Sequence, residues 1–129
     1  MRKKIMSAIL LVATAVTVGY YPQKALAAPS VHGNLNGTDC SGSVSIDWQS
    51  ATAETRYARG GTQIIAKATV YYWFTDYEES NYAIDETRGG GATARAYKKI
   101  GGADVKRGEG YHKVRYNGYE WSDNTVIYR

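Results

Sequence analysis

The sequence predicts an all-β fold, a small antiparallel β-sandwich with a barrel as the alternative, behind a cleaved N-terminal signal peptide. Three observations favour it. Apolar and polar residues alternate with a period of two in several segments between Val44 and Tyr128, as expected for strands with one buried face. Glycine-rich turns separate these segments, a spacing typical of sandwiches and barrels. No segment after the signal peptide has a convincing helical pattern.

The first 27 residues have the layout of a secretory signal peptide. Arg2-Lys3-Lys4 forms a basic start, an apolar run covers Ile5–Gly19, and Ala25-Leu26-Ala27 ends with the small residues that a signal peptidase recognises. The apolar run is shorter than the ~20 residues of a bilayer-spanning helix. We therefore expect cleavage after Ala27 and a secreted, extracellular protein without stable membrane insertion.

Cleavage also removes the apparent basic character of the chain. The whole sequence has 16 Lys and Arg residues against 12 Asp and Glu residues. The predicted signal peptide contains four of the bases and none of the acids: Arg2, Lys3, Lys4 and Lys24. The mature chain would then carry no formal net charge, and nothing in its charge points to a nucleic-acid partner.

Residues 28–42 are predicted to form a flexible N-terminal arm before a single all-β domain at 43–129. The arm is rich in Gly, Asn, Ser, Thr and Asp, a composition that favours turns and loops. Strand signals begin at Ser43, where Val44, Ile46 and Trp48 alternate with polar residues. The next segment, Ser50–Tyr57, is compatible with a strand or with a short helical turn.

The strongest predicted strand is Thr62–Phe74. Its even-numbered positions are apolar or aromatic throughout, and its other face becomes aromatic at Tyr71 and Trp73. This β-branched and aromatic content fits a long central strand. A turn at Asp76–Ser80 and a short strand at Asn81–Ile84 are expected to follow.

The C-terminal part contains further strand signals. Small residues alternate with larger ones over Ala92–Ile100, and a loop flanked by glycines follows. Tyr111–Trp121 is predicted to form a hairpin around Asn117-Gly118, because both residues of this dipeptide tolerate positive φ. A turn at 123–124 is expected before a last strand at Thr125–Tyr128. The sequence thus predicts six or seven strands.

Chemistry-bearing motifs are scarce. No metal-ligand cluster, phosphate-binding loop or nucleophile motif stands out, so we predict no cofactor and favour a non-catalytic protein over an enzyme. Cys40 is the one cysteine. An odd cysteine in a secreted protein indicates a free thiol or an intermolecular bridge, which leaves open a dimer through Cys40.

Aromatic residues give the leading hypothesis for function. The chain from residue 28 onward has ten tyrosines, three tryptophans and one phenylalanine, and tyrosine combines contact area with a polar tip. We expect an exposed aromatic and basic face whose binding residues are Tyr71, Trp73, Arg95, Tyr97, Tyr119 and Trp121. This predicts a binding module for an extracellular glycan, an anionic envelope polymer or a protein. The alternative is that the tyrosines fill a thin core.

Two other functions stay open. A short exported chain rich in glycine and tyrosine also fits a secreted antimicrobial or toxin-like protein. The third hypothesis is a small hydrolase or ribonuclease, because the segments Tyr111-His112-Lys113 and Tyr116-Asn117-Gly118-Tyr119-Glu120 resemble a stretch of the microbial guanyl-specific ribonucleases. The resemblance implies an acid–base pair of His112 and Glu120. The paired cysteines and the helix of that family have no counterpart here, and Glu120 could instead form an ion pair with Arg115 across the hairpin.

Overall fold

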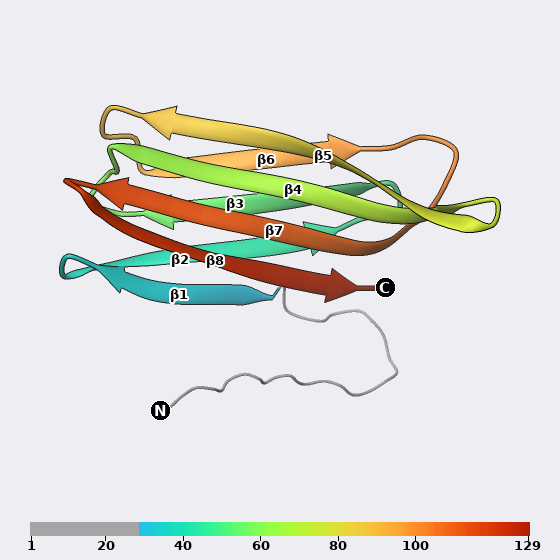
Figure 1. The fold of residues 1–129 in the computed structure, drawn as a ribbon, viewed down its shortest axis with the longest axis horizontal. Coiled ribbons are helices and arrows are strands. Elements are labelled where there is room, and N and C mark those ends of the chain that lie inside the picture. Colours follow the sequence, from blue (N-terminus) through green and yellow to red (C-terminus); the bar gives the residue numbers. More distant parts are fainter. Residues whose placement is uncertain (1–28) are drawn as a thin grey trace, which may run out of the picture.

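The computed structural model describes residues 29–129, which form eight strands and no helix (Figure 1). The predicted signal peptide lies outside the described residues. No helix able to cross a membrane occurs within the described part of the chain. In chain order the strands are β1 (Ser30–Leu35), β2 (Thr38–Ile46), β3 (Ser50–Tyr57), β4 (Gln63–Phe74), β5 (Tyr77–Arg88), β6 (Thr93–Lys99), β7 (Val105–Tyr116) and β8 (Tyr119–Tyr128).

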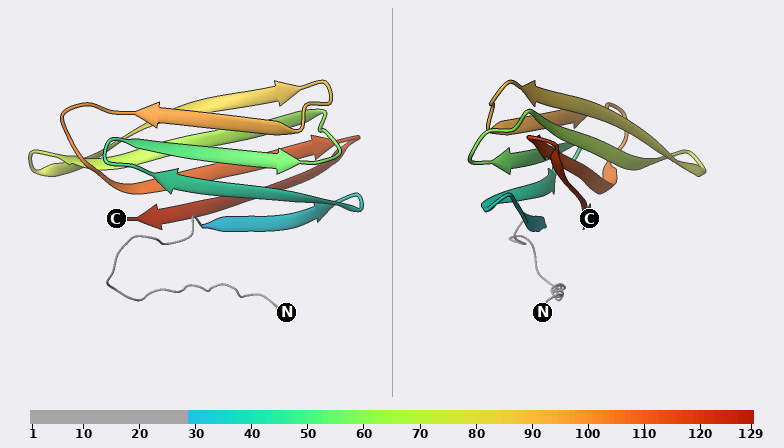
Figure 2. Two further views of the ribbon diagram at one scale, coloured as in Figure 1. Left: turned by 180° about the vertical axis from the view of Figure 1, so that it is seen from behind. Right: turned by 60° about the vertical axis from the view of Figure 1, so that its left-hand side comes forward.

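The strands form two antiparallel sheets that lie face to face (Figures 1 and 2). One sheet has the order β1-β2-β3-β6, and the other has the order β5-β4-β7-β8. Each strand packs against its counterparts in the opposite sheet, β1 against β8 at one side and β6 against β5 at the other. The all-β prediction and the two-sheet arrangement are confirmed. The barrel alternative is wrong, because the two ladders remain separate along residues 29–129.

The core is built mainly from small side chains. On β4, the inward residues Ile64, Ala66, Ala68 and Val70 are fully buried, and the residues between them are partly exposed, so the predicted alternation is confirmed. Alanines of β3 and β6 face them from the other sheet. Tyr57 is the bulkiest fully buried residue, and its hydroxyl donates a hydrogen bond to the Leu35 carbonyl at 2.8 Å.

Most other tyrosines do not fill the core, contrary to the alternative considered for them. Large exposed fractions are found for Tyr77, Tyr82, Tyr97, Tyr119 and Tyr128. Their abundance is therefore mainly a property of the surface of the protein.

The predicted N-terminal arm is wrong where the structure describes it. Residues 30–42 form β1 and the first part of β2, and Asn36-Gly37 is the turn between them, with φ of 53° and 85°. The Asn117-Gly118 turn between β7 and β8 was predicted correctly and has nearly the same φ values, 48° and 83°. Both are two-residue hairpin turns that require positive φ at both positions.

A physical reason explains why the strand signal was missed at the N-terminus. The inward positions of β1 and β2 include Gly33 and Gly42, which face Trp121 and His112 of the other sheet. Glycine contributes no apolar side chain, so the period-two pattern disappears although the strand is paired. Leu35 and Cys40 do point inward and are buried.

One expected turn is displaced and shortened, and another is replaced by strand. β5 begins at Tyr77 directly after the two-residue turn Thr75-Asp76, and β8 continues through 123–124 without a break. The first half of β5 is exposed on both faces, because the β4–β5 hairpin projects beyond the end of the sandwich (Figure 2). A strand without a buried face has no alternation of apolar residues to reveal it.

Gly108 and Gly110, which were expected to border a loop, lie inside β7 instead. Gly108 faces the opposite sheet, where a Cβ atom would lie 2.3 Å from Cγ2 of Ile46. The glycine permits close approach of the sheets rather than a turn.

Candidate ligand groove

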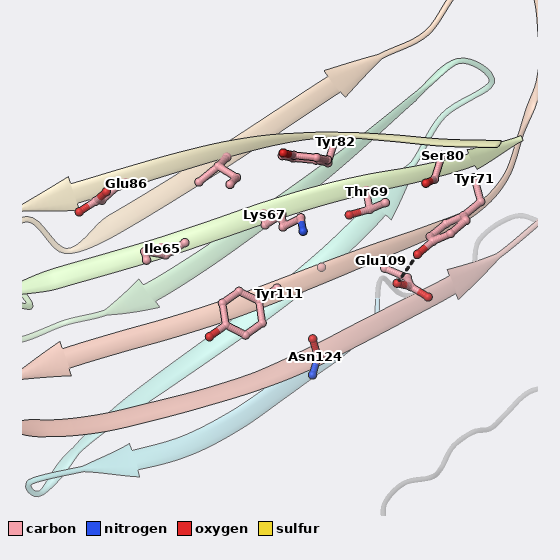
Figure 3. A pocket seen from close by; sticks show the side chains of 12 residues that line it. Ile65, Lys67, Thr69, Tyr71, Ser80, Tyr82, Glu86, Glu109, Tyr111 and Asn124 are labelled. Atoms are coloured by element: carbon pink, nitrogen blue, oxygen red, sulfur yellow. Dashed lines mark hydrogen bonds between the residues drawn. The ribbon is translucent and has the colours of Figure 1, made fainter.

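The outward face of the β5-β4-β7-β8 sheet carries a groove of about 690 Å³ (Figure 3). We call this outward face the groove face. Residues of β4, β5 and β7, with one residue of β8, line the groove: Ile65, Lys67, Thr69, Tyr71, Ser80, Tyr82, Ile84, Glu86, Glu109, Gly110, Tyr111 and Asn124.

The ladder register brings these side chains together. Because the even-numbered residues of β4 from Ile64 to Val70 are buried, its odd-numbered residues point away from the core. Lys67 lies between Ile84 of β5 and Tyr111 of β7, and Thr69 lies between Tyr82 and Glu109. Directly opposed residues of neighbouring strands are close enough to contact, so the groove face forms cross-strand rows of mixed aromatic, apolar and polar groups.

A packed cluster fixes one end of the groove. The Arg107 guanidinium lies over the Tyr71 ring, 3.7 Å from its centroid, and the Tyr71 hydroxyl donates to Oε1 of Glu109 at 2.9 Å. Burial, followed by the hydrogen bond to Glu109, raises the pKa of Tyr71, so this hydroxyl keeps its proton. Tyr71 and Glu109 therefore have defined orientations before any ligand arrives.

The middle of the groove is more open. The Tyr82 side chain is 54% exposed, and Nζ of Lys67 lies 4.5 Å from the centroid of its ring. Such a cation–π contact is modest at an exposed site. It nevertheless holds the ammonium group beside an aromatic surface.

The residues predicted to bind ligand do not form one surface. Tyr71 and Trp73 lie on the groove face, but Arg95 and Tyr97 lie on the outward face of β6, which belongs to the other sheet. The two pairs therefore lie on opposite sides of the sandwich, and the predicted joint surface is wrong. The reason is that outward-pointing residues of two strands share a face only when both strands belong to the same sheet.

Tyr119 and Trp121 differ from each other as well. Tyr119 is exposed beside the Asn117-Gly118 turn. Trp121 packs against the core, and its indole covers Gly33, where a Cβ atom would lie 2.2 Å from Nε1. Trp121 closes the β1–β8 side of the sandwich and is not a surface residue of the groove face.

The sequence prediction missed several groove residues, among them Lys67, Tyr82 and Tyr111. The parity of Lys67 with Tyr71 was visible within the predicted strand at 62–74. Tyr82 and Tyr111 become neighbours of Lys67 only through the pairing of β5 and β7 with β4, which no local pattern reveals.

The pair suggested by the ribonuclease resemblance does not assemble. His112 is fully buried between the sheets. Glu120 lies on the groove face, where its Oε1 is 3.4 Å from Nε of Arg115 and 3.7 Å from Nζ of Lys113. The cross-strand ion pair with Arg115 is thus confirmed. His112 and Glu120 point to opposite faces of one sheet and cannot act on one substrate.

His112 instead forms part of a buried hydrogen-bonded chain, and its pKa is lowered by burial to about 4. The Thr55 hydroxyl donates to the carbonyl of Ile65 at 2.8 Å. The same hydroxyl lies 2.8 Å from Nδ1 of His112, so the ring nitrogen donates to it. Nε2 then accepts from the Thr125 hydroxyl, also at 2.8 Å. Every polar atom of the neutral ring is satisfied, as buried polar groups require.

The Cys40 thiol is buried, and its pKa is raised mainly by desolvation and also by Asp39. A buried, protonated thiol is unreactive, so the structure gives no support to a dimer through Cys40. Within residues 29–129, no group of three or more His, Cys, Asp or Glu side chains is arranged to hold a metal ion.

Fold and site together define residues 29–129 as an eight-stranded antiparallel sandwich with an aromatic groove on one sheet. Comparisons with protein-family models, curated proteins and solved structures find no match to this chain.

Proposed function

We propose that this protein is a secreted, non-catalytic binding module that holds an extracellular glycan in the groove of the β5-β4-β7-β8 sheet. The observation that carries the proposal is the combination of aromatic rings with hydrogen-bonding groups in one concave surface. Sugars present apolar C–H faces and hydroxyl groups together. Binding sites are concave, with hydrophobic and aromatic walls and a small number of orienting polar groups.

The contrast between the two outward faces supports this choice of surface. Tyr82, Ile84, Val126 and Tyr128 are exposed on the groove face. The opposite face is mainly hydroxylic and charged, with Tyr97 as its large exposed aromatic residue. If aromatic residues were spread evenly over the surface, the two faces would carry similar numbers of them. Apolar surface concentrated on one face of a soluble domain points to binding.

Polar groups are available to orient a ligand. Thr69, Ser80 and Asn124 border the groove and can each donate and accept hydrogen bonds. Glu109, held by Tyr71 and Arg107, supplies a fixed acceptor for sugar hydroxyls. Fixing these groups in advance lowers the entropic cost of binding.

A glycan array probed with the purified protein tests the proposal, followed by titration of each positive glycan against two variants. Tyr82→Ala removes the open aromatic ring of the groove, and we expect it to weaken binding about tenfold, equivalent to ~1.4 kcal/mol. Tyr97→Ala is the matched control, since the Tyr97 side chain is 57% exposed on the opposite face and its loss should leave affinity unchanged. Equal effects of both variants, or an array without positive glycans, would contradict the proposal. Binding to an anionic polymer without sugar rings, or to a protein, would favour the other ligand classes.

A second candidate is a secreted antimicrobial protein, favoured by the tip of the β4–β5 hairpin. Trp73, Phe74 and Tyr77 are exposed there on a segment that projects from the sandwich (Figure 2). Tryptophan and tyrosine concentrate at membrane interfaces. This candidate expects purified protein to inhibit growth of bacterial strains and to release dye from lipid vesicles. Replacement of Trp73 and Phe74 by serine should abolish both effects, whereas Tyr82→Ala should not.

A further inference from the structure

We infer that the ligand of the groove is an acidic saccharide whose carboxylate or phosphate group binds Nζ of Lys67. The inference rests on the proposed glycan-binding function and adds the chemical class of the ligand. It starts from the charges of the groove face and the partners that each charge has.

Each carboxylate of the groove face already has a cationic partner. Glu86 pairs with Nε of Arg88 and also accepts from Nε2 of Gln63 at 2.7 Å. Nε of Arg107 lies 3.5 Å from Oε2 of Glu109, and its Nη2 lies 3.8 Å from Oε1 of Glu78. The remaining carboxylate, Glu120, pairs with Arg115 and Lys113 as described above. The acids of this face are thus compensated without Lys67.

Lys67 is the basic residue of the groove face that forms no ion pair with a carboxylate of residues 29–129. Among residues 29–129 its ammonium group takes part in no ion pair and no side-chain hydrogen bond. This ammonium group lies over the face of the Tyr82 ring. An ammonium group has three N–H donors, and the aromatic ring can interact with at most one of them. The remaining donors are available to a ligand.

The position of Lys67 makes this unpaired charge relevant to binding. The residue lies on the central strand β4, with Ile84 on one side and Tyr111 on the other, and it lines the groove (Figure 3). A ligand lying along the row Ile84–Lys67–Tyr111 would contact apolar surface on both sides of the charge. Hydrogen bonds in which a partner is ionised are roughly twice as strong as neutral ones, so an oxyanion is the group that complements this site.

The saccharide class follows from the remainder of the groove. Tyr82 and Tyr111 offer ring surface for sugar faces, and Thr69, Ser80 and Asn124 offer partners for hydroxyl groups. A uronic acid and a sugar phosphate both supply an oxyanion beside hydroxyl groups. The shared chemistry is a singly attached oxyanion on a hydroxyl-rich ring.

Isothermal titration calorimetry with matched probes tests the inference. The probes are an oligogalacturonate, the same oligomer fully methyl-esterified, a phosphorylated oligosaccharide of equal length and its dephosphorylated form. We expect the charged member of at least one pair to bind about tenfold more tightly than its neutral counterpart. The preference should shrink as ionic strength rises, because salt screens partly exposed charges. The pair that shows the preference identifies carboxylate or phosphate as the source of the anion.

Three variants assign the preference to Lys67. Lys67→Met keeps a long side chain but removes the charge, and should abolish the preference for the charged member of the pair. Lys67→Arg should retain the preference. Lys99→Met, on exposed β6 of the other sheet, is the matched control and should behave as the wild type.

Several results would overturn the inference, and they differ from failure of the proposed function. Equal binding of charged and neutral members refutes the acidic ligand, and an unchanged preference in Lys67→Met refutes its binding to Lys67. Both results leave glycan binding intact if Tyr82→Ala still weakens it. Absence of binding to all four saccharides overturns this inference but refutes glycan binding only if the broader array is also negative. Polyglutamate that binds more tightly than the saccharides and loses affinity in Lys67→Met would show that the groove recognises an acidic polypeptide instead.

Discussion

Acidification should destabilise this protein through His112 in a defined pH range. The ring is fully buried and neutral, and its pKa is lowered by burial to about 4 from an ordinary value of 6.5. Between these two pH values His112 is protonated in the unfolded chain but stays neutral in the folded protein. The free energy of unfolding therefore falls as pH decreases through this range. Above pH 6.5 the residue is neutral in both states and contributes no pH dependence.

The magnitude follows from the size of the shift. One pKa unit corresponds to ~1.4 kcal/mol, so a shift from 6.5 to about 4 corresponds to a loss of about 3 kcal/mol by pH 4. The residue is fully buried, which means that solvent screening does not reduce the effect as it would at the surface. Attraction by Asp123 favours the charged ring but is outweighed by desolvation. For a protein of marginal stability, such a loss is a substantial fraction of the total.

Urea denaturation followed by tryptophan fluorescence measures the effect at a series of pH values between 7 and 4. Because carboxylates also titrate at the acid end, the informative quantity is the difference between the wild type and His112→Gln, which cannot titrate. The wild type should lose stability more steeply than the variant, by about 1.4 kcal/mol per pH unit within the range. His32→Gln replaces the other histidine, exposed on β1, and should follow the wild-type curve.

Parallel pH curves for the wild type and His112→Gln would refute the reasoning. If His112→Gln does not fold, NMR titration of the His112 ring in the wild-type protein provides an independent measurement. A midpoint near the ordinary value, or a proton on Nε2 in place of Nδ1 in the neutral form, would show that the buried hydroxyl–imidazole chain is wrong.

Two further predictions concern backbone positions. Gly42→Ala should lower the free energy of unfolding by about 1–3 kcal/mol in urea denaturation, because the added Cβ would lie 2.2 Å from Cγ of His112 and would overpack the core. Gly101→Ala, where a Cβ meets open space, is the control. An equal cost for both variants would contradict the close approach. Thr75→Asn should raise stability by about 1 kcal/mol, because Thr75 has a φ of 58°, a left-handed conformation that β-branched residues disfavour and asparagine tolerates; an unchanged urea midpoint would show that the turn does not hold this conformation.

Local sequence patterns predicted the strands that have one continuous apolar face. β4 matches its predicted range within one residue at the N-terminal end, and β6 lies within the predicted Ala92–Ile100. The Asn117-Gly118 turn was found from its dipeptide alone. The identical dipeptide at Asn36-Gly37 carried the same signal, and the polar composition around it led to the wrong prediction of an arm. β1 and the start of β2 lack alternation because glycines occupy inward positions facing bulky rings.

The candidate site was predicted only in part. Tyr71 and Trp73 were placed correctly on the face of β4 that is directed away from the core. Their expected neighbours Arg95 and Tyr97 lie on the other side of the molecule, and the actual neighbours come from β5 and β7. Periodicity assigns residues to the two faces of one strand but contains no information on which strand lies beside it.

The sequence by itself determined that the chain is all-β, where its strongest strands lie, and that one of its tight turns is at Asn117-Gly118. These features depend on φ preferences and on residue spacing, both of which act over a few neighbouring positions. Only the tertiary structure decided that Lys67, Tyr82 and Tyr111 share a groove and that His112 is buried. Strand order and register are set by long-range hydrogen bonding and by the burial of two faces against each other, so distant segments acquire their neighbours only when the whole sandwich assembles.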